Sequence, residues 1–307
     1  MIRVVFLGTA ASRPTVGRNV SSVVIQRLGD FLMFDCGEGT QRQMLRFGTG
    51  FSVHHIFFTH MHADHLLGLP GLLRTMGLQG REEAMRLYCA RGEAAIVDQA
   101  VHLGVERVPF QISIHELKPG EVVERDGYDV VAFRTNHGRH SLGYALVEHQ
   151  RLGRFDPVRA RELGVPEGPL FGRLHRGEPV EVDGRTITPD LVVGDPRPGR
   201  RVVYTGDTRP ARTTVEQAAG ADLLIHEATF AHDERARARE TRHSTAREAA
   251  RVAREAGARR LILTHLSPRY GLEPDILERE ARAIFPATEI ARDGMAIEVP
   301  YPDDHDS

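Results

Sequence analysis

Three histidines and an aspartate lie within six consecutive positions, in the stretch His60-Met61-His62-Ala63-Asp64-His65. They follow the apolar run 55–58, which we expect to be a buried strand. Neutral imidazole and carboxylate are both zinc ligands. On a turning segment, His60 and His62 would point one way and Asp64 and His65 the other, so one loop could serve two metals. A histidine-rich surface loop is the plain alternative, but a place at the end of a buried strand favours chemistry.

Further groups of the same kind follow other apolar runs that we expect to be strands: His137, Asp207, His226 and His265. We expect three histidines on one metal, an aspartate with two histidines on the other, and one bridging carboxylate: His60, His62 and His137; Asp64, His65 and His265; and Asp207. This set predicts a two-metal hydrolytic centre. His226 is left over, and we interpret it as a structural or supporting residue.

Alternating apolar runs and helical patterns predict an α/β protein. The expected strands are 3–7, 20–26, 31–34, 55–58, 86–89, 112–114, 122–124, 130–133, 144–147, 201–205, 222–225, 261–263 and 296–299. The expected helices follow Gly39, cover 66–76 with an interruption at Pro70, and cover 92–103, about 215–219, 244–256 and 274–285. Ser244 is the predicted N-cap and Gly257 the end of the fifth helix. The similarity of 55–60 to 260–265 suggests two related halves.

The segment 151–189 interrupts this pattern. It is rich in Arg, Gly and Pro, and it is too long for an ordinary connection. We therefore predict a single domain, 1–307, with an inserted arm at 151–189. The alternative is a solvated surface insertion without a function.

Composition limits the classes of protein that the chain can belong to. With 41% hydrophobic and 27% charged residues among 307, the chain fits a globular protein. Its two cysteines favour a reducing cytoplasm, and no apolar run is long enough to span a membrane. The net charge of −2 does not indicate nucleic-acid binding, which would need a local basic patch.

Several motifs together resemble the ribonuclease Z family, the transfer-RNA 3′-processing endonucleases of the metallo-β-lactamase superfamily. Besides the histidine loop, the similar pieces are 6–9, 18–19, 34–41, 68–73, 206–209, 226–230, 243–245 and 263–265. The histidine loop alone indicates only the superfamily. The combination with His226-Glu227-Ala228-Thr229, His243-Ser244-Thr245 and Gly168-Pro169 in the arm is far more specific.

The resemblance implies a four-layer αββα sandwich with a di-zinc site at the sheet edge and an arm that grips precursor tRNA. It also implies a homodimer in which one subunit's arm presents substrate to the other subunit's site. The residues that it assigns to substrate are Arg18, Gly168 and Pro169. Val16 stands where the family usually has Lys in the loop that senses the 3′ end, so we expect altered discrimination against mature CCA ends.

The expected reaction is phosphodiester hydrolysis after the discriminator base, leaving a 3′-hydroxyl on the tRNA and a 5′-phosphate on the trailer. Asp64 is the candidate proton acceptor, and the resemblance makes His243 the phosphate-side residue, oriented by Glu227. Two Zn²⁺ ions are expected, although Mn²⁺ or Fe²⁺ would also suit the ligands. The alternatives are a di-zinc hydrolase of small phosphodiesters or esters and a degenerate RNA-binding subunit without activity.

Overall fold

A computed structural model describes residues 1–105, 107–271 and 273–301. The chain forms two compact units. The first consists of Met1–Val147 and the chain from Arg201 onward, and the second is Glu148–Arg200.

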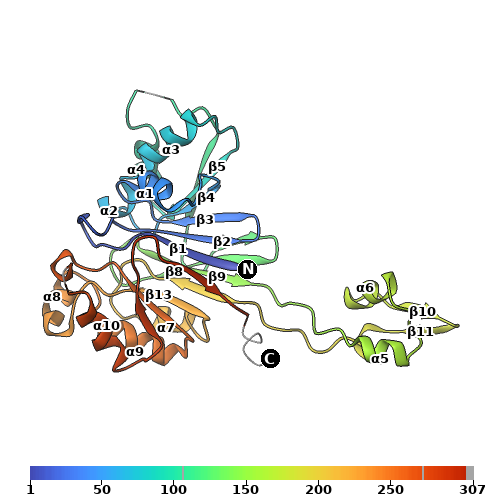
Figure 1. The fold of residues 1–307 in the computed structure, drawn as a ribbon. Coiled ribbons are helices and arrows are strands. Elements are labelled where there is room, and N and C mark those ends of the chain that lie inside the picture. Colours follow the sequence, from blue (N-terminus) through green and yellow to red (C-terminus); the bar gives the residue numbers. More distant parts are fainter. Residues whose placement is uncertain (106, 272, 302–307) are drawn as a thin grey trace. The chain divides into compact units, whose positions relative to one another are not determined.

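Two seven-stranded sheets form the centre of the first unit (Figure 1). The first sheet has the spatial order β16 (Ala296–Val299), β1 (Ile2–Gly8), β2 (Ser22–Arg27), β3 (Asp30–Phe34), β4 (His55–Phe57), β5 (Met85–Ala90) and β6 (Ile112–Leu117). The second has the order β15 (Thr288–Ile290), β14 (Leu261–Thr264), β13 (Leu223–Glu227), β12 (Arg201–Tyr204), β9 (Leu142–Glu148), β8 (Tyr128–Arg134) and β7 (Val122–Arg125).

Each sheet contains a run of four parallel strands, β3 to β6 and β12 to β15. This common layout agrees with two related halves. The repeated Thr-His sequence does not mark equivalent strands, however. In each sheet the parallel run lies at one edge, and we count strands from the opposite edge, which is β16 in the first sheet and β7 in the second. Counted in this way, β4 is the fifth strand of its sheet, whereas β14 is the sixth strand of the other.

Helices cover the outer face of each sheet (Figure 1). Over the first sheet lie α1 (Thr40–Phe47), α3 (Leu69–Leu78) and α4 (Ala94–Val101), and over the second lie α7 (Arg212–Gln217), α9 (Ala246–Ala256) and α10 (Asp275–Arg282). One apolar cluster fills the space between the sheets, and one lies under each helical layer. The predicted four-layer αββα sandwich is confirmed.

Local differences from the prediction have physical causes. The predicted helix 66–76 is two helices, α2 (Ala63–Leu66) and α3, and Pro70 lies in the first turn of α3, where its missing N–H costs nothing. The N-cap of α9 is Thr245, not Ser244. The Thr245 hydroxyl accepts from the Glu248 N–H, and the Glu248 carboxylate accepts from the Thr245 N–H. The sequence reading missed α8 (Arg235–Glu240), β15 and the short helices η2 (His232–Glu234) and η3 (Pro268–Tyr270).

The second unit is folded and has its own small core. It contains α5 (Pro157–Glu162), α6 (Pro169–His175), the hairpin of β10 (Val180–Val182) with β11 (Arg185–Ile187), and η1 (Pro189–Leu191). Six buried apolar side chains pack together, with Phe155 and Phe171 against them. The unit extends beyond the predicted 151–189 at both ends. In it, nine arginines balance nine carboxylates, so the unit is electrically neutral, whereas 151–189 alone reads as slightly basic.

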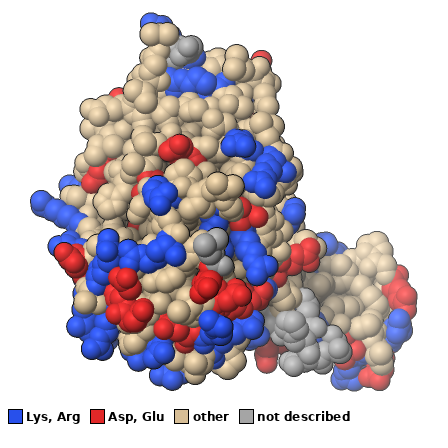
Figure 2. Space-filling model, turned by 60° about the vertical axis from the view of Figure 1, so that its left-hand side comes forward, with Lys and Arg blue, Asp and Glu red and all other residues tan. Residues whose placement is uncertain are grey.

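Charged side chains of both signs are interspersed on the face shown in Figure 2, in keeping with the small net charge. Among the described residues, no helix has both the length and the apolar character needed to cross a membrane.

Candidate metal centre and active site

The candidate ligands are carried to one place by the ends of strands from both sheets. The loop after β4 supplies His60 and His62, and the short helix α2 that continues it supplies Asp64 and His65. The remaining ligands follow strands of the second sheet: His137 after β8, Asp207 after β12 and His265 after β14. Histidine and aspartate side chains from both sheets therefore meet at the centre. Such groups are expected at the edge of a sheet where parallel strands end.

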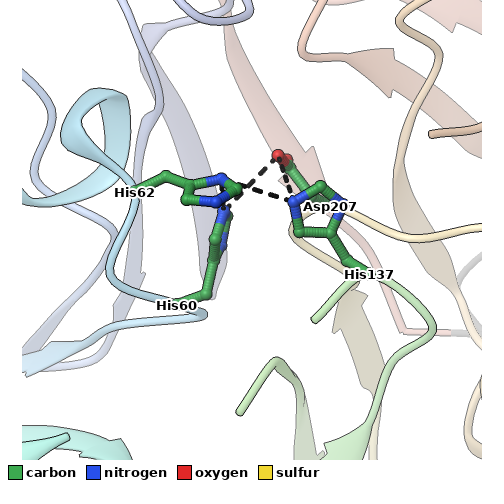
Figure 3. A group of neighbouring side chains, drawn as sticks. All are labelled: His60, His62, His137 and Asp207. Atoms are coloured by element: carbon green, nitrogen blue, oxygen red, sulfur yellow. Dashed lines mark hydrogen bonds and ion pairs between the residues drawn. The ribbon is translucent and has the colours of Figure 1, made fainter. Parts of the chain in front are cut away.

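The first group consists of three histidines and Asp207 (Figure 3). The Nδ1 atom of His62 lies 2.9 Å from Nε2 of His60 and 3.3 Å from Nε2 of His137. Asp207 Oδ2 lies 3.6 Å from Nε2 of His60 and 3.9 Å from Nε2 of His137. The four side chains point toward one another from both sheets, and their donor atoms converge on one point.

The second group consists of Asp64, His65 and His265. The Nε2 atoms of the two histidines are 3.4 Å apart, and Asp64 Oδ2 lies 3.3 Å from Nε2 of His265. Asp207 Oδ1 is 3.5 Å from His65 Nε2 and 3.3 Å from His265 Nε2. One oxygen of Asp207 thus faces each group, which is the place that the sequence predicts for a bridging carboxylate.

This arrangement fits divalent cations. Imidazole nitrogens face one another at 2.9–3.4 Å, and such contacts between ring nitrogens are poor hydrogen bonds when both rings are neutral. Asp207 Oδ1 is buried and has no hydrogen-bond partner among the described residues, and a buried carboxylate oxygen is costly without one. A set of histidine nitrogens and carboxylate oxygens with an unsatisfied acceptor at its centre is typical of a divalent metal site.

Four of the five ligand histidines are held from behind through Nδ1. The Nδ1 atoms of His60 and His265 lie 3.0 Å from the hydroxyls of Thr59 and Thr229, respectively. Those of His65 and His137 lie 2.8 Å from the Asp35 carboxylate and 3.0 Å from the Arg242 carbonyl. A proton donated from Nδ1 leaves Nε2 unprotonated toward the centre, which is the tautomer that a metal needs.

Asp35 is the main supporting residue to which the sequence reading gave no role. Its buried carboxylate accepts hydrogen bonds from Thr59 N–H at 2.8 Å and Tyr204 O–H at 2.9 Å, besides its contact with His65. Its backbone has φ +58°, an uncommon value for a non-glycine residue. The sequence signals were a carboxylate directly after an apolar strand and its place in the family-like piece 34–41, but neither showed its partners, which lie 24 to 169 positions away.

Two other supporting residues have unusual backbone conformations. Ser12, at φ +62°, donates its backbone N–H to Asp64 Oδ2 at 2.7 Å. Arg242, at φ +60°, donates from Nη1 to the His137 carbonyl at 3.1 Å and accepts from His137 through its own carbonyl. Sequence alone carries no signal for these backbone contacts.

Burial and neighbouring charges shift the pKa values of two ligand histidines in opposite directions. Burial, and then the neighbouring His65, lower the pKa of His60 well below its usual value. Burial would also lower the pKa of His65, but the charges of Asp207 and Asp35 raise it well above normal. In the chain alone, a proton on His65 thus compensates the two carboxylates. A divalent cation serves the same purpose, because metal binding releases such protons.

His243 and Glu227 form a pair beside this centre. His243 Nδ1 lies 2.9 Å from Glu227 Oε1 and 3.9 Å from Asp207 Oδ2. Burial alone would lower the pKa of His243, but the charge of Glu227 and the hydrogen bond to it raise that pKa to about 9. Glu227 is fully buried and also accepts from the N–H groups of Thr208 and Ser244. Among the described residues, the His243 Nε2 atom has no hydrogen-bond partner, and His243 also lies with Asp207 and His265 in a third group of possible metal ligands.

His226 takes part in none of the ligand groups. Its Nδ1 atom lies 2.7 Å from the Glu227 carbonyl, and its Nε2 atom is buried with no hydrogen-bond partner among the described residues. Burial lowers its pKa. This agrees with the interpretation of His226 as a residue outside the metal set.

The predicted substrate residues occupy different surroundings. The Nη1 atom of Arg18 donates to the Thr9 hydroxyl at 2.7 Å and to the Ala291 carbonyl at 2.6 Å, so part of its guanidinium anchors its own loop. Val16, in the same loop, is fully exposed. In the second unit, Gly168 and Pro169 begin α6 and are exposed. Substrate binding by Arg18, Gly168 and Pro169 stays a prediction.

Comparisons with known proteins agree with this geometry. A model of the β-lactamase superfamily domain matches residues 178–266, and a model of the anti-Pycsar protein Apyc1 matches residues 2–153. Proteins named ribonuclease Z match over nearly the whole length. The one from Myxococcus xanthus is 56% identical and covers 99% of both chains, and the one from Gemmatimonas aurantiaca is 57% identical and covers 96% of this chain and 95% of the relative.

Solved structures of related proteins have the same fold. The crystal structure of human tRNase Z, short form, superposes with a TM-score of 0.70 at 28% identity and covers 97% of this chain and 99% of the human one. The metallo-β-lactamase-fold protein YhfI from Bacillus subtilis, with a TM-score of 0.69 at 20% identity over 96% of this chain and 98% of that one, shares the fold. The chain therefore belongs to the ribonuclease Z family, on the metallo-β-lactamase fold.

Proposed function

We propose that this protein is a metal-dependent endoribonuclease that removes the 3′ trailer from precursor tRNA by hydrolysis after the discriminator base. The observation that carries this proposal is the His243–Glu227 pair beside two ligand groups that share Asp207. Membership of the ribonuclease Z family supports the substrate class. The products would be a tRNA with a 3′-hydroxyl and a trailer with a 5′-phosphate.

The cofactor of this proposal is two Zn²⁺ ions per chain. One would be held by His60, His62 and His137, the other by Asp64, His65 and His265, and Asp207 would bridge them. When bound, such a metal pair supplies a nucleophilic water at neutral pH and neutralises charge on the scissile phosphate. Mn²⁺ or Fe²⁺ would suit the same nitrogen and oxygen ligands.

Asp64 acts as the proton acceptor in this proposal. Burial alone would raise its pKa, but the hydrogen bond with His265 and the charge of His65 hold that pKa below its usual value. Its carboxylate is therefore ionised at any physiological pH. The Ser12 N–H, 2.7 Å from Oδ2, fixes the orientation of this oxygen.

His243 acts as the proton donor to the departing 3′-oxygen. A ribose 3′-oxygen is a poor leaving group unless it gains a proton as the bond to phosphorus breaks. The raised pKa of His243 keeps the ring protonated at neutral pH. Glu227 binds Nδ1, which turns the Nε2 proton toward the substrate side.

The second unit, Glu148–Arg200, is the proposed exosite arm. Because it is neutral and most of its arginines pair with its own glutamates, for example Arg159 with Glu162 and Arg173 with Glu178, charge alone does not explain RNA binding. We therefore propose contacts through shape and backbone groups around Gly168 and Pro169, the mode by which folded RNA is usually recognised. The arm would serve the active site of a second copy in a homodimer.

Subunit mixing tests this part of the proposal. The Asp64→Ala variant has an intact arm and a disabled active site. The arm-deleted variant has an intact active site and no arm. Mixed after dissociation, the two should regain up to about a quarter of the wild-type activity if the arm acts across the dimer. With precursor well below KM, a mixture that is no more active than its two components measured separately would refute it.

We also place the protein in the cytoplasm. The two cysteines, Cys36 and Cys89, are free and buried, and burial raises the pKa of each thiol to about 12. Unpaired, unreactive thiols agree with a reducing compartment.

Cleavage of a 3′-extended precursor tRNA, mapped to the nucleotide, tests the proposed function. Wild-type protein loaded with zinc should make a single cut after the discriminator base, and Asp64→Ala should make none. A CCA-bearing precursor in the same gel tests whether Val16 changes discrimination. A precursor that stays intact while a small aryl phosphodiester or ester is hydrolysed would assign the site to a small-molecule hydrolase instead.

A further inference from the structure

A groove with basic walls borders the metal centre at His137. The part next to the centre, about 550 Å³, is lined by His137 together with Arg134, Arg139 and Arg242. A second hollow of about 320 Å³ shares Arg134 and Arg139 with it and continues to Arg91 and Lys118. His137 is a candidate metal ligand, so this end of the groove borders the metal centre.

The charge of this groove differs from that of the rest of the chain. Five cationic side chains line its two parts, and none of the described lining residues is a carboxylate, although the whole chain has a net charge of −2. Arg91, Arg134 and Arg139 have no side-chain hydrogen bond or ion pair with any described residue. Lys118 pairs with the exposed Glu121 at 3.8 Å, a contact that contributes little.

The walls are tight turns held by hydrogen bonds. The turn between β8 and β9 is joined to the end of β5 by the His140 Nδ1 atom, 2.8 Å from the Arg91 carbonyl. The Thr213 hydroxyl donates to the Arg134 carbonyl at 2.7 Å. These two contacts join the segments that carry Arg91 and Arg134 to their neighbours in the wall. Unpaired arginines held over such a groove suit a phosphate backbone.

We infer that this groove binds the single-stranded 3′ trailer of the precursor through its phosphates. This inference rests on the proposed function. Cleavage after the discriminator base leaves one unpaired nucleotide on the tRNA side, and the acceptor stem beyond it is a duplex, too wide for a groove between turns. Only the trailer supplies several unpaired nucleotides in succession. The contacts are with phosphates, so the groove accepts trailers of any sequence.

Precursors with one tRNA body and trailers of one or twelve nucleotides test the inference. With the long trailer, Arg134→Gln/Arg139→Gln should raise KM about three- to tenfold at low salt, as expected for two exposed charge contacts. The slope of log(kcat/KM) against log salt should fall by about 1.4, at about 0.7 for each phosphate contact on a single strand. With the one-nucleotide trailer, the variant should match wild type. Arg91→Gln, at the far end, should affect only the long trailer.

Arg251→Gln/Arg254→Gln is the matched control, because it removes the same charge from two exposed positions on α9. It should leave both substrates unaffected. Equal losses for both trailer lengths, or no loss for either, would overturn the inference. A wild-type protein that fails to cut even the one-nucleotide precursor would instead overturn the proposed function.

Crosslinking gives a second measurement that needs no variant. A precursor with 4-thiouridine at the third trailer nucleotide should crosslink to peptides that contain residues 90–92, 117–119 or 134–142. Crosslinks confined to other peptides would place the trailer elsewhere and refute the inference.

Discussion

Asp35 is a buried side chain that would control the proposed metal centre. Its carboxylate lies 2.8 Å from Nδ1 of His65, and it also accepts hydrogen bonds from Thr59 and Tyr204. The contact fixes the tautomer of His65 and raises its basicity toward a metal. In the proposed metal centre, Asp35 would therefore act on the metal without touching it.

Asp35→Asn should lower metal affinity about 10- to 100-fold, the usual effect of removing a partner of a ligand histidine. Competition with a chelator, followed by metal analysis, measures this. Asp30→Asn is the control, because Asp30 binds Arg125 and Tyr128 and none of the ligand residues. Equal metal retention by Asp35→Asn and wild type would refute the role assigned to Asp35.

The His243–Glu227 pair predicts a pH dependence. The pKa of His243 is raised to about 9, so the protonated ring is fully present at neutral pH and is lost as the pH rises through that value. A bound cation would lower this pKa, so the falling limb of kcat lies at or below pH 9. Glu227→Gln should shift it toward the ordinary histidine value of about 6.5.

Single-turnover rates between pH 5 and 10 would check this prediction. The wild-type rate should fall on the alkaline side, and the Glu227→Gln rate should fall at lower pH. Identical profiles for the two proteins would show that His243 is not the proton donor.

The sequence predicted the ligand residues but not their supports, and the reason is physical. His60, His137, Asp207 and His265 each follow an apolar run that reads as a strand, and strand ends meet at one edge of a sheet. Ser12 and the Arg242 carbonyl act through backbone atoms that any residue carries. Their roles follow only from the fold that brings distant segments together.

At the scale of elements, α9 connects stability to the active site, because it begins three residues after His243. The capping box of Thr245 and Glu248 fixes its first turn. Arg209 links this cap to His243, because its guanidinium binds the Glu248 carboxylate and also donates to the His243 carbonyl at 2.7 Å. A loosened cap should therefore also disturb His243.

Thr245→Ala should lower the free energy of unfolding by about 0.5–2 kcal/mol, the usual cost of a lost N-cap. It should also lower kcat more than it raises KM. Thr241→Ala is a matched control, since its hydroxyl bonds only to the Arg237 carbonyl on an exposed turn. Denaturant unfolding combined with steady-state kinetics would decide, and equal effects of the two variants would contradict the prediction.

The elements that sequence missed are short or atypical. In the arm, α5 and α6 have six and seven residues and β10 and β11 have three each, too few to show a period. Asp156 caps α5, and prolines stand in the first turns of α5 and α6. These signals were present but lay among Gly and Pro residues typical of a loop. The long strands of both sheets, in contrast, were predicted to within a few residues.

At the scale of the whole molecule, the proposed function gives the metal site and the arm separable tasks. The chemistry belongs to Met1–Val147 with the chain from Arg201 onward, whereas Glu148–Arg200 has its own core. The buried pair of Glu148 and Arg200 joins the two chain segments at the ends of the arm. A deletion that keeps this pair, with a short Gly-Ser turn between the two residues, should preserve the rest of the fold.

The arm deletion should raise KM for precursor tRNA on the order of tenfold to a hundredfold, as the loss of about 1.4–2.8 kcal/mol of binding would. Hydrolysis of a small aryl phosphodiester should continue at the wild-type rate, because that substrate needs only the metal centre. A replacement of Gly168 by Ala, at φ +129°, should cause a smaller loss of the same kind. Full precursor cleavage without the arm would refute the exosite.

The direction of bond cleavage tests the central claim most directly. Precursor tRNA cleaved by the wild-type protein in H₂¹⁸O, under single-turnover conditions, yields two products that mass spectrometry can resolve. Attack of water on phosphorus with departure of the 3′-oxygen predicts one ¹⁸O atom in the 5′-phosphate of the trailer and an unlabelled 3′-hydroxyl on the tRNA. A tRNA that ends in a 2′,3′-cyclic or 3′-phosphate, with a trailer bearing a 5′-hydroxyl, would contradict the proposed reaction at this centre.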